Sequence, residues 1–336
     1  MLKKSFSKKN IVLLTFLLLV VFMATACGSK GTTSGSGTGS STTQNEKTTE
    51  KADKKIRIGA SMAMVVDFMS YVVKAMQDYA KEHPDIELTI VDANQNASTQ
   101  LNQVENFIAK KMDAIIVHPV DTESTQPIVE AAKKAGIPLI AVNRKFPGAD
   151  CYVGSDAYES GKLLMEYLAQ KAGGKGNVAI MVGTLGSEPA RLRTQAIKDV
   201  IAKYPNMKIV LEGAADWVRD KGMALMENWL QSGKEFDIVA SNNDEMAIGA
   251  IKALEAAGKL SKVMVGGIDA LPQALQYLKE GKMAVTVFQN AHDQGYRGVE
   301  MAYKAAKGEK IPPEVMIPYE LVKPEDADKY MARWQK

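Results

Sequence analysis

From residue 55 to the C-terminus, short apolar runs alternate with segments whose apolar residues recur at helical spacing, and this order limits the possible folds more than any other feature. Between 98 and 111, for example, Leu101, Val104, Phe107 and Ile108 form one apolar face. Strands that alternate with helices predict parallel sheets covered by helices on both faces. In the first half we expect strands at 56–60, 87–92, 114–118 and 138–143, and helices at 69–82, 98–111 and 124–135.

The second half repeats this order, so we predict two similar α/β domains, which suits a chain of 336 residues. Its expected strands are 178–182, 208–212, 237–241 and 263–267, with helices at 190–203, 219–232 and 244–257. The remaining tail is too small for a third domain, so we expect it to complete both sheets and to cross between them as a stiff hinge. It contains predicted helices at 272–280 and 294–307 and strands at 284–289 and 315–321.

The first 54 residues are typical of targeting and linking segments. A basic start at 3–9 precedes an apolar run at 11–26, which suits a secretory signal and is short for a membrane span. The small residues before Cys27 resemble a bacterial lipobox, whose Cys is lipidated after cleavage; an ordinary secretory cleavage is the alternative. We predict a lipoprotein signal peptide at 1–26, and at 27–54 a lipidated Cys27 with a disordered Gly/Ser/Thr tether that anchors the protein at the outer face of the cell membrane.

The charge balance excludes nucleic acid as a partner. The chain has 42 Lys and Arg and 39 Asp and Glu, and four of the basic residues precede Cys27. Without those four, 38 bases face 39 acids, so the body lacks the basic surplus that nucleic acid requires. Beyond Cys27 only Cys151 remains, so we expect no disulfide in the body and an inert, packed thiol at Cys151.

Polar and aromatic side chains follow several predicted strands in both halves. In open parallel sheets, ligands bind beyond the carboxyl ends of the strands, so these residues are the candidates for a binding site. If the two sheets face each other, all of them meet in one cleft between the domains. The candidates are Asp67, Phe68, His118, Asn143 and Arg144 in the first half, and Arg193, Trp217, Asn243, Asp269 and Gln289 in the second.

These side-chain types suit a polyhydroxy ligand, because a sugar hydroxyl both donates and accepts hydrogen bonds. Carboxylates accept, guanidinium groups donate and amides do both, while Phe68 and Trp217 can pack on the C–H face of a ring. Structural alternatives stay open: both aromatic residues could be core, and Asp269 could cap a helix. In Asn242-Asn243-Asp244 we expect one residue to cap the next helix and Asn243 to bind the ligand.

Two neighbouring features are predicted to have structural roles. Arg191 is predicted to be a surface or supporting charge. The methionine-rich stretch with Met62, Met64, Met69 and Met76 is predicted to be adaptable core.

The sequence lacks the short motifs of the common enzyme classes. It has no phosphate-binding P-loop, no dinucleotide-binding glycine motif after a strand and no Gly-x-Ser-x-Gly turn. Its three His residues, His83, His118 and His292, have no partner at metal-ligand spacing. We therefore expect a protein that is not an enzyme and has no metal and no cofactor.

Three segments resemble the type I periplasmic binding proteins for monosaccharides, which are the ribose, galactose/glucose and inositol receptors of ABC importers. They are Ile58-Gly59-Ala60-Ser61, Asn242-Asn243-Asp244-Glu245-Met246-Ala247 and Gly267-Ile268-Asp269. The resemblance runs from 55 to 321 and implies that the candidate residues contact sugar, although His118 stands where members often have Asn. The loop at 172–177 lacks the carboxylates of the calcium loop that some members carry, so no calcium is expected there.

The resemblance also implies the architecture and the partners. It implies two Rossmann-like domains, 55–155 plus 290–319 and 156–289 plus 320–336, joined by a multi-strand hinge. It further implies a monomer that captures a monosaccharide or cyclitol by hinge closure and delivers it to ABC permease and ATPase subunits. A sugar or autoinducer-like signal receptor of the same fold, acting with a membrane sensor, is the first alternative, and a secreted α/β enzyme is the second.

Overall fold

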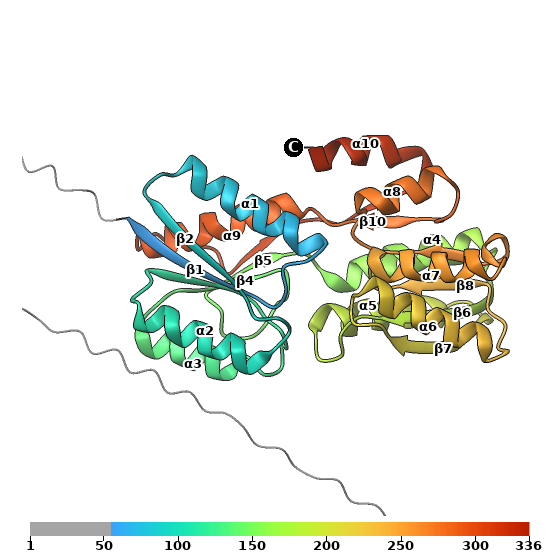
Figure 1. Cartoon of the computed structure of the whole chain (residues 1–336), viewed down its shortest axis with the longest axis horizontal. Coiled ribbons are helices and arrows are strands. Elements are labelled where there is room, and N and C mark those ends of the chain that lie inside the picture. The colour runs from blue at the N-terminus through green and yellow to red at the C-terminus, as the bar shows by residue number, and fades with distance from the viewer. Residues whose placement is uncertain (1–54, 336) are drawn as a thin grey trace, which may run out of the picture. The chain divides into compact units, whose positions relative to one another are not determined.

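The computed structural model describes residues 55–335, and the predicted signal peptide, Cys27 and the tether lie outside the described residues. The described chain forms two parallel β-sheets, each covered by helices on both faces (Figure 1). This arrangement confirms the predicted α/β class with two sheet domains. The half built on the first sheet is called the first lobe below, and the other half the second lobe.

The first lobe has six parallel strands in the spatial order β11 (Glu314–Met316), β5 (Cys151–Gly154), β4 (Leu139–Val142), β3 (Ala114–His118), β1 (Ile56–Met62) and β2 (Ile86–Asp92). Its helices are α1 (Phe68–Glu82) and α9 (Ala291–Ala306) on one face and α2 (Ala97–Ala109) and α3 (Gln126–Ala135) on the other (Figure 1). Strand side chains alternate between these faces. Ile58 and Ile116 share a core cluster with Val72 of α1, whereas Ile115 packs in a separate cluster with Phe107 of α2.

The second lobe has four parallel strands in the order β7 (Asn206–Ala214), β6 (Lys175–Val182), β8 (Ile238–Ser241) and β9 (Met264–Gly266). Its helices are α4 (Ala157–Lys171), α5 (Glu188–Ile201), α6 (Arg219–Gln231), α7 (Asp244–Ala256), α8 (Pro272–Lys279) and the short α10 (Ala327–Met331). β10 (Thr286–Phe288) pairs antiparallel with β12 (Glu320–Val322). Single bridges at Val285 and Phe288 join the β10 segment to the β9 side of the sheet.

Within residues 55–335 the chain passes between the lobes three times, after β5, after β10 and after β11. Three chain connections between the lobes allow a hinge motion and prevent the lobes from moving independently of each other. We keep the boundaries 55–155 plus 290–319 and 156–289 plus 320–336 as a proposal for the two domains.

The predicted single strand at 315–321 is wrong. The structure has two short strands there, β11 in the first sheet and β12 beside β10, linked by Ile317, Pro318 and Tyr319. Pro318 has no N–H to donate to a ladder, so it favours a break between two strands. β5 and α4 were not predicted: β5 has only four residues, and the buried face of α4 includes the small residues Ser160 and Gly161, which do not mark an apolar stripe.

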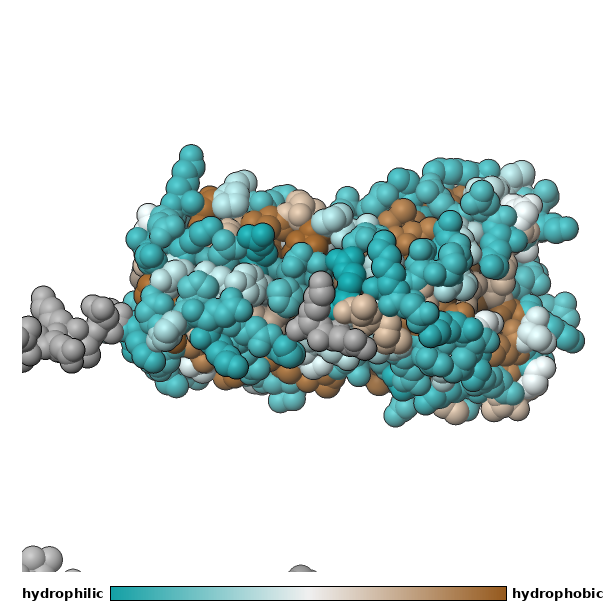
Figure 2. All heavy atoms as spheres, turned by 90° about the horizontal axis from the view of Figure 1, so that it is seen from above, coloured by the Kyte–Doolittle hydropathy of each residue, from teal (hydrophilic) through white to brown (hydrophobic). Residues whose placement is uncertain are grey.

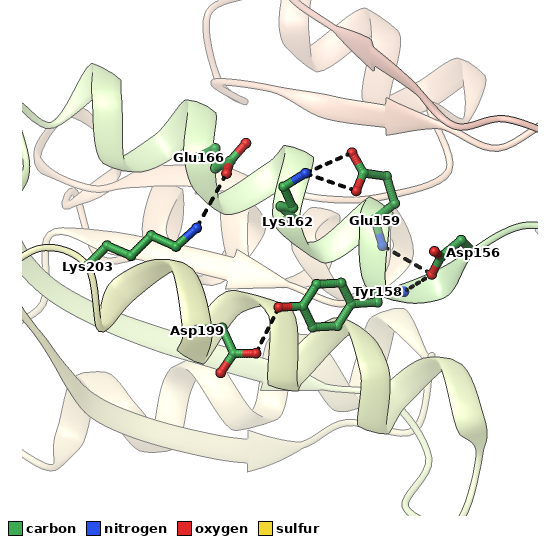
Figure 3. Close-up of polar contacts among 7 residues, drawn as sticks. All are labelled: Asp156, Tyr158, Glu159, Lys162, Glu166, Asp199 and Lys203. Atoms are coloured by element: carbon green, nitrogen blue, oxygen red, sulfur yellow. Dashed lines mark hydrogen bonds and ion pairs between the residues drawn. The ribbon is translucent and has the colours of Figure 1, made fainter.

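Close packing of α4 against α5 positions the part of α5 that carries Arg193. Gly161 lies so near the backbone carbonyl of Arg193 that a Cβ at this position would overlap it. Along the same contact, Tyr158 Oη donates to Asp199 Oδ2 at 2.8 Å (Figure 3). Asp156 caps α4, because its Oδ1 accepts the N–H of Tyr158 at 3.0 Å. The contacts of Gly161 and Tyr158 on α4 therefore fix the position of α5 beside α4.

The surface of the described part is mainly polar. On the face drawn in Figure 2, hydrophilic residues dominate and apolar residues form small separate areas. Among residues 55–335, the exposed large apolar side chains are Val66, Leu185, Ile209 and Met316. Scattered apolar side chains of this kind are ordinary on a protein surface. None of the helices in this described range combines the length and apolar character needed to span a bilayer.

Candidate functional site

All ten predicted site residues line one pocket between the two lobes. The space between its lining atoms amounts to about 480 Å³, open solvent at the mouth included. The first lobe contributes Asp67, Phe68, His118, Asn143 and Arg144, and the second contributes Arg193, Trp217, Asn243, Asp269 and Gln289. The carboxyl ends of the strands in the two sheets therefore face a common space.

Four of these residues have a positive φ: 46° at Asp67, 67° at Asn143, 70° at Trp217 and 131° at Asp269. A residue with a Cβ rarely adopts such a backbone, because the Cβ crowds the neighbouring peptide groups. Conformations of this kind persist where the surrounding fold imposes them, and they gather at functional sites. The loops of both lobes thus hold these side chains at a local energetic cost.

Arg193 on α5 connects the pocket to the strands that join the lobes. Its guanidinium donates to Asn242 O at 2.7 Å, to Gln289 Oε1 at 2.9 Å and to Tyr319 Oη at 2.8 Å. Its Nε has no hydrogen-bond partner among the described residues. These three bonds use three of the five guanidinium N–H groups and fix the orientation of the group, and the Nε–H remains unpaired in the pocket. Arg191 is exposed and does not line this pocket.

Arg144, which follows β4, supplies a second buried guanidinium. Its Nη1 donates to Pro119 O at 2.8 Å and to Val120 O at 3.2 Å, and its Nε also lacks a partner among the described residues. Burial and the like charge of Arg193 lower the pKa of Arg144 to about 10, so it remains charged at neutral pH. The pocket therefore offers fixed, charge-assisted donors from both lobes.

The ring of Trp217 lies near both guanidinium groups. Cζ of Arg144 is 5.9 Å and Cζ of Arg193 is 5.8 Å from the ring centroid, within cation–π range. Trp217 is 8% exposed, and its indole N–H has no partner among the described residues. A purely structural core residue would leave that N–H unsatisfied at a cost. Trp217 also belongs to the core cluster, so it packs in the core and lines the pocket at the same time.

His118, at the end of β3, is buried, and both its ring nitrogens lack partners in the described chain. Burial holds the pKa of His118 well below its ordinary value, and the positive charge of Arg144 lowers the pKa further. The imidazole is therefore neutral at physiological pH. It offers one donor and one acceptor, which matches what a hydroxyl group can take and give.

The two carboxylates of the pocket lie at different depths. Asp269 is buried, and burial raises its pKa well above the usual value, although the charge of Arg193 opposes this. Asp67 is exposed at the mouth, yet the surrounding protein atoms and the charge of Glu245 still raise its pKa, while Arg219 lowers it. Asp269 is not a helix cap, since α8 begins after Leu271.

Asn243 has a second role that the sequence did not indicate. We expected a neighbour to cap α7, but Asn243 is itself the cap, because its Oδ1 accepts the N–H of Met246 at 3.0 Å. Its Nδ2 donates to Trp217 O at 3.1 Å. The expected division between a capping residue and a binding residue is therefore wrong. The residue that lines the pocket also fixes the Trp217 loop.

The amides of Asn143 and Gln289 tie the pocket to the interlobe segments. Asn143 Nδ2 donates to Gln294 Oε1 at 2.8 Å, and Gln294 Nε2 reaches Ser155 Oγ at 3.4 Å beside the first crossing of the chain. Gln289, at the second crossing, accepts from Arg193. The hydrogen bonds of these two pocket amides thus reach the segments that connect the lobes.

An apolar wall completes the pocket. Phe68 belongs to the core cluster and also lines the pocket, so both readings of this residue hold. Met64, Val66, Met69 and Pro189 line it too and were not predicted as site residues. The strand-end rule could have found Met64, which lies in the loop after β1, and Met69, which lies beside Phe68 at the start of α1. Methionine side chains adapt their shape to a ligand easily.

No cluster of three or more His, Cys, Asp or Glu side chains within residues 55–335 is arranged to hold a metal ion. Cys151 is buried in β5. Burial raises the pKa of its thiol to about 11, which keeps it protonated and unreactive.

Comparison with known proteins agrees with this geometry. Residues 62–310 match the family model described as a periplasmic binding protein domain. The putative rhizopine-binding protein of Rhizobium meliloti is 43% identical, over 79% of this chain and 89% of that protein. The xylitol-binding protein of Mycolicibacterium smegmatis is 37% identical, over 79% and 76% respectively. An ABC transporter solute-binding protein of Bacillus halodurans C-125, solved with bound myo-inositol, is 48% identical with a TM-score of 0.82, over 84% of this chain and 99% of that one. This chain therefore belongs to the periplasmic binding protein family that its sequence motifs resemble.

Proposed function

We propose that this protein is the substrate-binding component of an ABC importer and that its pocket captures a monosaccharide or a cyclitol. The relatives include a xylitol-binding protein and a solute-binding protein with bound myo-inositol, and both of these ligands are polyols. Myo-inositol is the first ligand to test, because it occupies the structure that is 48% identical to this chain. Both relatives are binding proteins, so we describe a binding protein and not an enzyme.

One observation carries the proposal. Within a single pocket, buried polar atoms of His118, Arg144, Arg193 and Trp217 have no hydrogen-bond partner among the described residues. Leaving each unpaired costs about 1–3 kcal/mol. Hydroxyl groups around one ring would pair with these atoms, while the ring's C–H face would pack on Trp217. A pocket built in this way rejects analogues that lack a hydroxyl, because its own groups then stay unpaired.

Hinge closure is the mechanism that this position supports. Each lobe supplies half of the predicted site residues, so a ligand gains its full set of contacts only with the lobes together. The lobes also touch directly, since Thr122 Oγ1 donates to Gly186 O at 3.1 Å. A ligand that contacts both lobes favours the closed form over the open one. The closed form would then dock on the permease and ATPase subunits of the importer.

The location and the assembly are further parts of the proposal. Family membership supports an extracytoplasmic protein. We infer from the sequence alone that Cys27 carries a lipid after residues 1–26 are removed, that 28–54 tether the body to the outer face of the cell membrane, and that the protein acts as a monomer. Mass spectrometry of the membrane fraction should find a lipidated N-terminal Cys27, and Cys27→Ala should release the protein. An unlipidated N-terminus at or beyond Cys27 would contradict the anchor.

A thermal-shift screen tests the function. Residues 28–336 are heated with myo-inositol, ribose, xylose, galactose, glucose, allose and xylitol, one at a time. A ligand that binds only the folded state raises the melting temperature. We expect a rise with at least one cyclitol or monosaccharide, myo-inositol first. No rise with any polyol would overturn the carbohydrate assignment.

A further inference from the structure

A residue outside the pocket joins the segments on both sides of it. Trp334 lies in the short 3₁₀ segment Ala332–Gln335, which follows α10 at the end of the described chain. Figure 1 shows α10 beside α8, with the C-terminal end of the chain turned toward α1. Trp334 does not line the pocket between the lobes. It nevertheless contacts a segment of each lobe that leads into the pocket.

On the first lobe, Trp334 packs against the beginning of α1. Its ring meets Tyr71 edge-on, with centroids 4.5 Å apart and an interplanar angle of 61°. It also meets Phe68 at 6.5 Å and 83°. Edge-to-face pairs of this kind contribute about 0.5–1.5 kcal/mol beyond the buried area. Trp334 therefore packs against Phe68, which lines the pocket.

On the second lobe, the indole N–H of Trp334 donates to Ala270 O at 2.7 Å. Ala270 has a φ of 53° and directly follows Asp269, which has a φ of 131°. Two consecutive residues with a positive φ form a strained turn that needs outside support. The hydrogen bond from Trp334 fixes the backbone carbonyl of Ala270, the residue directly after Asp269, whose buried carboxylate lines the pocket.

The segment that presents Trp334 is itself fixed to the second lobe. Arg333 Nη1 donates to Glu320 Oε1 at 2.6 Å, and Tyr330 Oη donates to Glu320 Oε2 at 2.8 Å. The guanidinium of Arg333 also lies 4.0 Å from the ring centroid of Phe288 in β10. The second lobe thus holds the indole of Trp334 in place against the first lobe.

We propose that Trp334 is a positioning residue of the ligand site, which sets Phe68 and the Asp269–Ala270 turn in their ligand-binding arrangement when the lobes are together. This inference rests on the proposed function. Because Trp334 contacts both lobes, its loss should destabilise the closed, ligand-bound arrangement more than it destabilises either lobe by itself. The dissociation rate of the ligand, which reports the lifetime of the closed form, is the quantity that should respond most.

The test uses the full mature chain and myo-inositol, or the first polyol that raises the melting temperature of the wild type. Binding is measured by calorimetry and by stopped-flow fluorescence. Trp334→Ala should weaken binding at least about 10-fold, mainly through faster dissociation. Trp334→Phe keeps an aromatic ring and loses the N–H, so it should weaken binding about 3-fold and remain informative if the Ala variant fails to fold. The acceptor is the backbone carbonyl of Ala270, which no substitution removes, so the pair of Trp334 variants separates the role of the ring from that of the N–H.

Trp229→Phe is the matched control, because it removes a tryptophan of the second lobe that packs on Phe236 and does not line the pocket. It should change affinity less than 2-fold. Equal loss of melting temperature in the free and ligand-bound forms of Trp334→Phe, with unchanged affinity and dissociation rate, would show a merely structural role and overturn the inference. Absence of polyol binding by the wild type would instead overturn the proposed function.

Discussion

The indole ring of Trp217 lies directly against the backbone of Gly183, at a point where one added methyl group would overlap the ring. Gly183 follows β6, and Trp217 follows β7, so the two loops fit together at the edge of the second sheet. The same contact places the ring within 6 Å of the guanidinium groups of Arg144 and Arg193. The position of the aromatic wall therefore depends on a glycine that does not line the pocket.

Gly183→Ala should displace Trp217 and weaken polyol binding about 10-fold or more, because the added Cβ and the ring cannot share the space. Calorimetric titration measures the change. In a Trp217→Ala background the same substitution should add little, since the clash is gone, and the coupling of the two changes is read from the double-mutant cycle. Fully additive effects would show that Gly183 acts elsewhere.

Tyr319→Phe should reduce the affinity for the ligand about 3- to 10-fold. It removes one of the three hydrogen bonds that orient the Arg193 guanidinium, and a bond to a charged group contributes about 1.5–3 kcal/mol. Tyr303→Phe is the control, because its hydroxyl bonds Asp85 on the exposed surface, away from the pocket. The same affinity for both variants would contradict a role of Tyr319 in the site.

His118 should make the protein less stable in mild acid. Burial keeps the folded pKa of His118 well below 6.5, whereas the unfolded side chain takes up a proton near that pH. Stability from this residue is complete above pH 6.5 and falls as the pH drops toward the folded pKa. Urea unfolding at pH 7.5 and 5.5 should show that lowering the pH reduces the free energy of unfolding less for His118→Asn than for the wild type. Equal reductions in the two proteins would mean that His118 takes up a proton in the folded state.

Glu188 should give the opposite dependence of folding stability on pH. Burial raises its pKa to about 7, so between pH 4.5 and 7 the folded protein holds a proton that the unfolded chain releases. Its contribution to stability is complete below pH 4.5 and is lost as the pH rises toward 7. Glu188→Gln cannot titrate, so its unfolding midpoint should fall less than that of the wild type from pH 5 to pH 7.5. An identical fall in both proteins would contradict the raised pKa.

The strand-end rule predicts that the ten candidates meet, and they line one pocket, because the rule depends on the fold and not on side-chain detail. In a parallel sheet, every residue that follows a strand lies at the carboxyl edge of that sheet. Arg144 follows a strand of the first sheet and Trp217 a strand of the second, so each lies at such an edge. Periodicity also found most strands and helices. Their exact ends differ by one to a few residues, because capping depends on local hydrogen bonds such as the one made by Asn243.

Features that depend on long-range contacts could not be predicted. The capping role of Asn243 involves its bond to the Trp217 loop, and neither bond leaves a pattern in the sequence. The division of 315–321 into β11 and β12 depends on which sheet each half joins. Likewise, the C-terminal Trp334 gives no sign that its N–H reaches Ala270, which lies far from it in the chain.

The central claim is that one polyol sits in a pocket walled by Trp217 and side chains from both lobes. Calorimetric titration of residues 28–336 with myo-inositol, beside the same titration of Trp217→Ala, tests it most directly. We predict one bound molecule per wild-type chain and at least about 30-fold weaker binding by the variant, the scale of a hot-spot residue. Equal binding by wild type and variant, or no heat from the wild type with any cyclitol or monosaccharide, would contradict the account.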